Sequence, residues 1–353
     1  MAQPITSICI LRLSAIGDVC NAVSVVQSIQ RQHPQAQITW IIGKIEARLL
    51  EGLPGVRFVV FDKKLGKAAY SQLKQDLKHD YFDVLLHMQV AFRANVASLC
   101  IKARKKIGFD WHTAKELHAL FMRHRIAPAP RSHVLDGFRQ FAKAIGVSEQ
   151  ELGQTPTWQL PIPEADELWA KQQLAATGNA RILIISPAAS KAERNWLPER
   201  YAALADYAHA KGFAVILSGG PTELERTLSQ AILASAQQPI TDLTGKTNLK
   251  QLLALLKHAS LVLAPDTGPT HMAVAVGTPV IGLYGHSNPD RTGPYLFRQY
   301  VVEVYHKSLL AQHGKTAAEL KWGTRVKGSD IMPLITVEAV TAMFDKVVAE
   351  QQL

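Results

Sequence analysis

With 353 residues, 47% of them hydrophobic and 19% charged, the chain has the size and composition of a folded protein with two domains. No apolar run approaches the ~18 residues that a membrane-spanning helix needs, which excludes a chain that crosses a membrane. The formal net charge of +10 is concentrated in residues 1–165, with 21 Lys and Arg against 13 Asp and Glu, whereas residues 166–353 carry 18 against 16. We therefore expect an anionic partner at the first half.

The first half begins with alternating strand and helix patterns. Residues 8–13 predict a buried strand, residues 21–32 a helix that stops before Pro34, and residues 38–42 a second strand. A further strand is predicted at residues 82–87 and a helix at 93–103. This order is typical of a sheet of parallel strands with crossover helices.

The second half repeats the alternation. Its predicted strands and helices are residues 181–186 (strand), 198–211 (helix), 213–217 (strand), 222–234 (helix), 249–258 (helix) and 261–264 (strand). A second α/β sheet is therefore expected.

A proline-rich stretch without helical period, residues 155–163, separates the two halves. We expect a first domain over residues 1–163 and a second over 164–335. Residues 336–353 have the apolar spacing of a helix, which could pack back on the first domain.

Residues 1–5 lack the basic and apolar regions of a secretory signal, which predicts a cytoplasmic protein. Cys9, Cys20 and Cys100 are scattered in apolar contexts. We expect reduced thiols rather than disulfides or metal ligands.

The loop after the first strand carries an acidic residue, in Ser14-Ala15-Ile16-Gly17-Asp18. It lacks the G-x-G-x-x-G spacing of dinucleotide-binding loops, which disfavours a nicotinamide-dependent dehydrogenase. Asp18 could cap the next helix or act as a general base at the carboxyl edge of the sheet.

Two loops of the second half combine polar and cationic groups. Lys191 and Arg194 follow one strand and could hold a diphosphate, or be solvated loop charges. Ser218-Gly219-Gly220-Pro221 follows the next strand and permits close approach of a ligand. Glu223 could then bind ribose hydroxyls, or be a favourable charge in the first turn of a helix.

The most informative stretch is Asp266-Thr267-Gly268-Pro269-Thr270-His271, which lies between a strand pattern and a helix pattern. Pro269 suits the first position of a helix, whose free N–H groups would point back toward the turn. Helix N-termini attract anions, so the stretch predicts a phosphate site, although an ordinary capped turn has the same pattern. Taken together, the loops of the second half indicate a nucleotide-diphosphate ligand.

These motifs, in this order, resemble the ADP-heptose:lipopolysaccharide heptosyltransferases of glycosyltransferase family 9, and closest the heptosyltransferase I type. The resemblance rests on the Asp18 loop, Arg194-Asn195-Trp196, the glycine loop with Glu223, and Asp266 to His271 followed by Gly277-Thr278-Pro279-Val280. It implies an α/β fold of GT-B type, in which two Rossmann-like, doubly wound domains face a cleft. It also implies inverting transfer of heptose from ADP-heptose to Kdo, with or without a phosphate on the Kdo, in the lipopolysaccharide inner core.

The resemblance also implies roles for single residues. Asp18 becomes the catalytic base, and the donor would be bound by Ser190, Lys191, Arg194, Glu223, Asp266, Thr267, Gly268 and His271. The family often has Lys at the position of Arg194, so either Arg194 or Lys191 could neutralise the leaving diphosphate. The acceptor candidates are Ser14, Lys64, Arg93, Arg123 and Arg125.

Displacement of ADP builds negative charge on the leaving phosphate, and the chain has no Asp-x-Asp pair to clamp a metal there. We expect no cofactor and no required metal, with a helix N-terminus and cations in its place. The expected partners are the donor, a Kdo-lipid A acceptor and the anionic cytoplasmic face of the inner membrane, and not nucleic acid. A later core step, or a GT-B sugar-nucleotide epimerase, remains the alternative.

Overall fold

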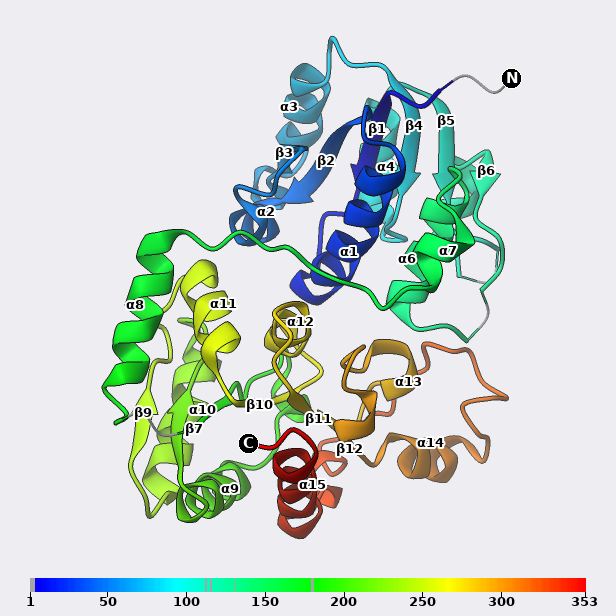
Figure 1. The fold of residues 1–353 in the computed structure, drawn as a ribbon. Coiled ribbons are helices and arrows are strands. Elements are labelled where there is room, and N and C mark those ends of the chain that lie inside the picture. Colours follow the sequence, from blue (N-terminus) through cyan, green and yellow to red (C-terminus); the bar gives the residue numbers. More distant parts are fainter. Residues whose placement is uncertain (1–3, 112, 115, 130, 179–180) are drawn as a thin grey trace. The chain divides into compact units, whose positions relative to one another are not determined.

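The computed structural model describes residues 4–111, 113–114, 116–129, 131–178 and 181–353. The chain forms two compact units, residues 1–161 and residues 162–353. Each unit is one uninterrupted segment with its own parallel sheet (Figure 1).

The first unit is built on a six-stranded parallel sheet with the order β3-β2-β1-β4-β5-β6. Its strands are β1 (Ser7–Leu11), β2 (Gln37–Gly43), β3 (Val56–Phe61), β4 (Phe82–His87), β5 (Ala103–Gly108) and β6 (His124–Arg125). Its helices are α1 (Ile16–Gln32), α2 (Lys44–Leu50), α3 (Ala68–Asp76), α4 (Phe92–Ala97), α5 (His118–Phe121), α6 (Val134–Lys143) and α7 (Glu149–Gly153), with short 3-10 turns η1 (Lys63–Leu65) and η2 (Ser98–Cys100).

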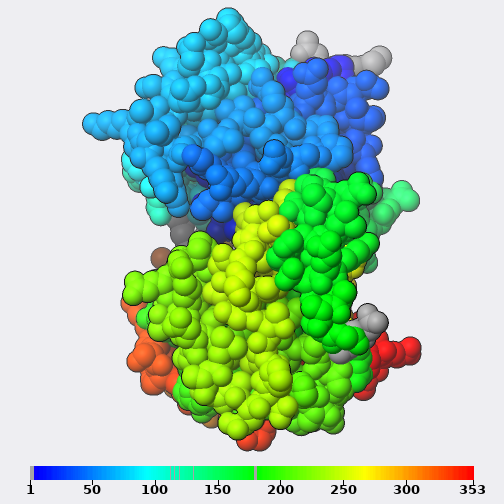
Figure 2. All heavy atoms as spheres, turned by 90° about the vertical axis from the view of Figure 1, so that its left-hand side faces the viewer, coloured from blue at the N-terminus to red at the C-terminus, as the bar shows by residue number. Residues whose placement is uncertain are grey.

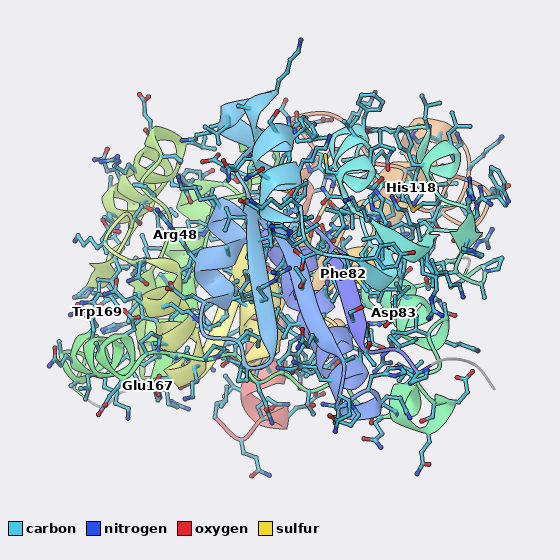
Figure 3. The ribbon with its side chains drawn as sticks, turned by 90° about the horizontal axis from the view of Figure 1, so that it is seen from above. Arg48, Phe82, Asp83, His118, Glu167 and Trp169 are labelled. Carbon is cyan, nitrogen blue, oxygen red and sulfur yellow. The ribbon has the colours of Figure 1, made fainter. Side chains whose placement is uncertain are left out.

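Both faces of β1 are buried, as a doubly wound sheet requires. Cys9 and Leu11 join a core cluster with residues of α3 and α4, and Ile8 and Ile10, on the opposite face, are also inaccessible to solvent. Asp83, labelled in Figure 3, fixes the start of β4 to β1 by accepting from the N–H groups of Thr6 (2.8 Å) and Ser7 (3.1 Å).

The proline-rich stretch before residue 163 is attached to the first unit. Trp158 donates its indole N–H to the Cys20 carbonyl on α1 (2.8 Å). Gln27 and Gln159 exchange two hydrogen bonds, of 2.9 and 3.1 Å. Most of the stretch that we expected to be a linker is therefore fastened along α1.

The second unit has the same sheet topology, with the order β12-β11-β10-β7-β8-β9. Its strands are β7 (Arg181–Ile185), β8 (Phe213–Leu217), β9 (Ile240–Asp242), β10 (Leu261–Pro265), β11 (Val280–Tyr284) and β12 (Val301–Glu303). Its helices are α8 (Glu164–Ala175), α9 (Pro198–Ala210), α10 (Glu223–Ser235), α11 (Leu249–His258), α12 (Gly268–Ala275), α13 (Pro289–Thr292), α14 (Tyr305–His313) and α15 (Val337–Glu350), with 3-10 turns η3 (Ala192–Arg194), η4 (Arg298–Tyr300) and η5 (Met332–Leu334).

Helix α8 packs against α11, and Figure 2 shows the two side by side at the surface of the second unit. Glu167 of α8, labelled in Figure 3, accepts from Lys257 (3.0 Å) and contacts His258 (2.7 Å) on α11. These contacts join the first helix of the unit to α11.

The C-terminal helix α15 packs within the second unit. Phe344 is fully buried, with its ring 5.0 Å from Phe213 of β8 and 5.9 Å from Tyr207 of α9. The apolar face that suggested packing onto the first domain is used within the second.

The helix predicted at residues 93–103 is too long at its end, because the 3-10 turn η2 follows α4 and ends at Cys100. Helix α4 ends at Ala97, and Ala103 begins β5 instead. Lys105 and Lys106 align with Val84 and Leu85 of β4, so pairing in the sheet overrides the local helical pattern. The three cysteines are free thiols, as predicted.

Candidate functional site

The loop after β1 is held by both neighbouring strands of the first sheet. The Leu13 N–H donates to Gln89 Oε1 beyond β4 (2.7 Å), and the Gly43 N–H at the end of β2 donates to the Leu13 carbonyl (2.9 Å). The loop therefore lies at the carboxyl ends of three adjacent strands. Between β1 and β4 the strand order changes direction, which is where open α/β sheets bind ligands.

Asp18 is the third residue of α1. Its carboxylate caps the start of this helix and also forms an ion pair. Oδ2 accepts from the Ala15 N–H (3.4 Å) and contacts the guanidinium of Arg12. Arg12 also donates to the Met88 carbonyl (2.6 Å) and lies over the Phe138 ring, 5.2 Å from its centroid. Because the Asp18 side chain is still 33% exposed, the carboxylate is fixed in place but accessible to a substrate. Sequence reasoning did not find Arg12.

The predicted acceptor residues do not gather at one place in the first unit. Ser14 is in the loop after β1, and Arg93 is exposed on α4, which follows β4. Lys64 is exposed beyond the edge strand β3, whereas Arg123 and Arg125 lie at β6, the opposite edge. Strands spaced ~4.8 Å apart put these edges roughly 24 Å from each other. Lys64 and the two arginines at β6 therefore cannot hold the same charged group.

In the second unit, the loops after β7 and β10 are joined by a buried ion pair. Arg194 Nη2 donates to the Asp266 carbonyl (2.6 Å) and to Asp266 Oδ2 (3.1 Å), and the two side chains are 13% and 14% exposed. Lys191 is 70% exposed and only 3.7 Å from Glu193 Oε1. Of the two candidate cations, Arg194 therefore lies at the carboxyl ends of the strands, and Lys191 lies at the surface.

The stretch from Asp266 to His271 forms the strand-to-helix turn predicted from its sequence. Thr267 precedes α12, Gly268 begins it, and Pro269 is its second residue, one position later than expected. The free N–H groups of the first turn belong to this loop, beside Arg194. The resulting edge presents N–H donors and a guanidinium, which are the groups that a diphosphate requires.

Asp266 is ionised at this edge despite its burial. Burial alone would raise the pKa of its carboxyl, but His271, Ser287 and Arg194 more than offset that effect, and the net shift is downward. His271 is 7% exposed, with Nε2 3.9 Å from Asp266 Oδ1. A charged Asp266 can hold Arg194 and accept a hydrogen bond from a sugar hydroxyl.

The side chains of Arg194 and Trp196 fasten the loop to other parts of the unit, and Asn195 braces it internally. Arg194 holds Asp266, and Asn195 Oδ1 accepts from the Ala189 N–H (2.7 Å). The buried Trp196 donates its indole N–H to the Ile335 carbonyl (2.9 Å). The motif thus positions a cation by tying its loop at both ends. The predicted donor residue Ser190 lies exposed in the same loop.

Arg325 is a second cation at this edge that sequence reasoning missed. Its Nη1 donates to Ser287 Oγ (3.3 Å) in the loop after β11. Burial is the main cause that lowers the pKa of Arg194; the charge of Asp266 raises this pKa, and the nearby charge of Arg325 lowers it. Within the described residues no carboxylate pairs with Arg325. No motif marks a residue that reaches the site from 38 positions away.

The glycine loop after β8 is held by Glu225, two residues beyond the predicted ribose-binding residue Glu223. Glu225 accepts from the Gly220 N–H (2.7 Å) and from Thr222 Oγ1 (2.5 Å). A Cβ on Gly220 would lie 2.8 Å from Glu225 Oε2, so a larger residue there would displace this carboxylate. Glu223 is the exposed first residue of α10, and its side chain is therefore available to a ligand.

Among the described residues, no three His, Cys, Asp or Glu side chains gather as metal ligands would. The same part of the chain contains no helix with the length and apolar character needed to cross a bilayer.

Comparison with known proteins places this geometry in a family. The sequence profile of glycosyltransferase family 9 (heptosyltransferase) matches residues 70–322. The chain is 45% identical over 340 residues, 96% of each chain, to the lipopolysaccharide core heptosyltransferase OpsX of Haemophilus influenzae. The chain belongs to glycosyltransferase family 9. It is an enzyme of the heptosyltransferase type.

Solved structures of family 9 proteins share the fold. A family 9 glycosyltransferase from Veillonella parvula matches with a TM-score of 0.80 at 22% identity, over 99% of both chains. Escherichia coli heptosyltransferase WaaC with ADP matches with a TM-score of 0.73 at 19% identity, over 97% of this chain and 100% of the other. The predicted α/β fold of GT-B type, with two Rossmann-like units, is confirmed.

Proposed function

We propose that this family 9 enzyme transfers heptose from ADP-heptose to a Kdo residue of the lipopolysaccharide inner core, with inversion at the anomeric carbon. The observation that carries the proposal is the Arg194–Asp266 pair at the start of α12, which offers cationic and N–H groups at a sheet edge suited to a diphosphate. The similarity to a lipopolysaccharide core heptosyltransferase over 96% of the chain supports the sugar and the pathway.

The donor side is assigned to the second unit. A structural neighbour contains ADP and another ADP-2-deoxy-2-fluoro heptose, which supports an ADP-linked donor here. The diphosphate would lie against Thr267, Gly268 and the first turn of α12, with Arg194 and Arg325 beside it. Glu223 would bind the ribose hydroxyls, and Asp266 with His271 the sugar.

The base is Asp18. Its carboxylate takes the proton from the acceptor hydroxyl while that oxygen forms a bond to the anomeric carbon of heptose. The bond from that carbon to the diphosphate oxygen breaks on the opposite face, and ADP leaves with the electron pair. Positive groups at the donor edge stabilise the charge that develops on the leaving phosphate. These groups can act without a metal.

Product analysis tests the proposal. The enzyme is incubated with ADP-heptose and Kdo-lipid A, with and without a phosphate on the Kdo, and the product is measured by mass spectrometry and NMR. We expect ADP release only with acceptor, a mass increase of one heptose, and an inverted linkage. Release of ADP without transfer of heptose would exclude the proposal. Conversion of free ADP-heptose to an isomer would also exclude it and would indicate an epimerase.

The core step is tested by a second acceptor that already carries one heptose on Kdo. Faster transfer to this acceptor than to Kdo-lipid A would assign the enzyme to a later step. The Asp18→Asn variant is the control in both reactions, because it keeps the donor edge unchanged.

A further inference from the structure

We propose that a basic pocket at the β6 edge of the first unit binds the phosphate headgroup of an anionic phospholipid at a bilayer surface. The pocket has a volume of about 550 Å³, and its lining consists of Lys105, Ile107, Arg123, His124, Arg125, Ala127, Gln140, Lys143 and Ala144. The lining contains four permanent cations and no carboxylate. A cavity with this lining suits a phosphate that carries a polar headgroup.

The pocket is separate from the loop that carries Asp18. Its floor is formed by β5 and its side by the last turn of α6, with β6 at its edge. The His33 ring, which lies just after α1, contacts the Ile145 carbonyl just beyond α6 (3.0 Å), so that end of α6 lies toward the amino ends of the strands. Asp18 lies at the carboxyl end of β1, three strands from β6, roughly 14 Å across the sheet.

The cations of the pocket are available to a ligand to different degrees. Lys143 is paired with Glu149 at the rim. Lys105 and Arg123 are exposed, and neither forms an ion pair with any residue that the structure describes. Two uncompensated positive charges that line one pocket repel each other, and an anion bound in the pocket relieves that repulsion.

An exposed aromatic side chain stacked on a residue of the pocket indicates a bilayer rather than a free anion. Arg125 stacks on the Trp111 ring with its guanidinium carbon 3.7 Å from the centroid, and Trp111 itself is 68% exposed. An exposed aromatic ring next to phosphate-binding cations is typical of an interface with lipid headgroups.

The inference rests on the proposed function, because a glycolipid acceptor is what brings this enzyme to a membrane. Its test measures no transfer, so failure of one can be told from failure of the other. Vesicles of phosphatidylcholine alone, and of equal parts phosphatidylcholine and phosphatidylglycerol, are sedimented with the full-length protein. We expect binding to the mixed vesicles and not to the neutral ones.

The variant Lys105→Gln with Arg123→Gln should bind the mixed vesicles about twenty-five-fold less tightly, since each basic residue contributes roughly a factor of five at an anionic surface. The matched control is Lys74→Gln with Lys78→Gln, which removes the same charge from exposed positions in and just after α3. We expect the control to change binding less than about threefold. Equal losses of vesicle affinity in both variants would show that binding depends only on the net charge of the protein, and would overturn the proposal.

Two further arms separate a bilayer from other ligands. Trp111→Ala should weaken binding to the mixed vesicles, whereas Tyr81→Ala, at an equally exposed position, should not. Binding only to vesicles that contain the acceptor glycolipid, or complete release by inorganic phosphate at constant ionic strength, would overturn the phospholipid assignment. Unchanged melting temperatures establish that the variants are folded.

Discussion

The guanidinium of Arg12 contacts the carboxylate of Asp18 across the loop that joins β1 to α1. Arg12 is 11% exposed and also bonded to the carbonyl of Met88 on the neighbouring strand segment, so it cannot follow Asp18 if the loop moves. The carboxylate is therefore positioned by a side chain that directly follows β1 and is bonded to the segment after β4, and not by a residue of the helix.

Replacing Asp18 by Asn should abolish most of the transfer while leaving the fold intact. An amide oxygen can still accept from the Ala15 N–H, but it cannot take a proton from the acceptor. We expect kcat to fall by about 10²–10⁴, the usual contribution of a general base, with the Kd for ADP unchanged. Turnover within threefold of the wild type would exclude Asp18 as the base.

Replacing Arg325 by Gln should weaken the enzyme toward its donor. The variant keeps a donor for Ser287 Oγ but loses the charge beside Arg194. A charged hydrogen bond is worth about 1.5–3 kcal/mol, so we expect the Kd for ADP, measured by calorimetry, to rise about tenfold or more. Lys327→Gln, which removes a neighbouring exposed charge, is the control. Equal increases of the Kd for ADP in the two variants would show that Arg325 acts only through the overall charge of the unit and not through a contact with the donor.

The two acidic residues of the glycine loop should separate binding from stability. Glu223→Gln, at an exposed position, should raise the Kd for ADP and leave the melting temperature unchanged. Glu225→Gln weakens the acceptor of the Gly220 N–H and should lower the melting temperature. If Glu223→Gln binds ADP like the wild type, ribose recognition lies elsewhere.

Stability of the first unit should fall as the pH decreases from 6.5 toward 4. Burial, and then the nearby charge of Arg125, lower the pKa of His118 from 6.5 to about 4. Between these values the unfolded chain binds a proton that the folded chain does not, so folding loses up to about 1.4 kcal/mol per pH unit. Its Nε2 accepts from the Phe109 N–H (3.1 Å), and protonation would replace that acceptor by a donor.

The variant His118→Gln can still accept from Phe109 and donate to Asn95, but it does not titrate. We expect denaturant unfolding of this variant to depend less on pH between 6.5 and 5 than that of the wild type. Burial also lowers the pKa of the neighbouring His87, which remains in the variant and leaves part of the slope. Parallel pH profiles of the two proteins would contradict the assignment.

Phe344→Ala should destabilise the second unit. The side chain is fully buried against Phe213 and Tyr207, and its removal leaves a cavity that costs about 3–5 kcal/mol. Leu310→Ala, at a half-exposed position of α14, is the control and should change the free energy of unfolding little. Thermal unfolding of both variants checks this.

Local patterns were sufficient for the elements whose sequence and tertiary environment agree. The strand at residues 82–87 and the helix at 249–258 have the predicted bounds, because their apolar residues face the core at the spacing that each structure requires. The pattern at residues 93–103 misled because β5 takes its stability from pairing with β4, which no local signal records.

The motifs likewise identified the loops at the strand ends and not the side chains that reach those loops from elsewhere. The Asp18 and Asp266 loops were predicted because their residues are adjacent in sequence. Arg325 approaches Ser287 through a tertiary contact, and Glu225 differs from Glu223 only in which side of the first helical turn it occupies. Which side chain reaches a loop depends on the direction in which that side chain points, and this direction cannot be read from composition or spacing.

Each half of the molecule is an uninterrupted stretch of chain with its own complete sheet, and α15 returns to its own half. The chain therefore passes from one half to the other only once, after Pro161. A donor half from a different family member can thus be joined at this point by a single recombination event, without dividing either hydrophobic core. If donor and acceptor are bound by separate units as proposed, specificity for the nucleotide sugar and specificity for the acceptor can be inherited independently.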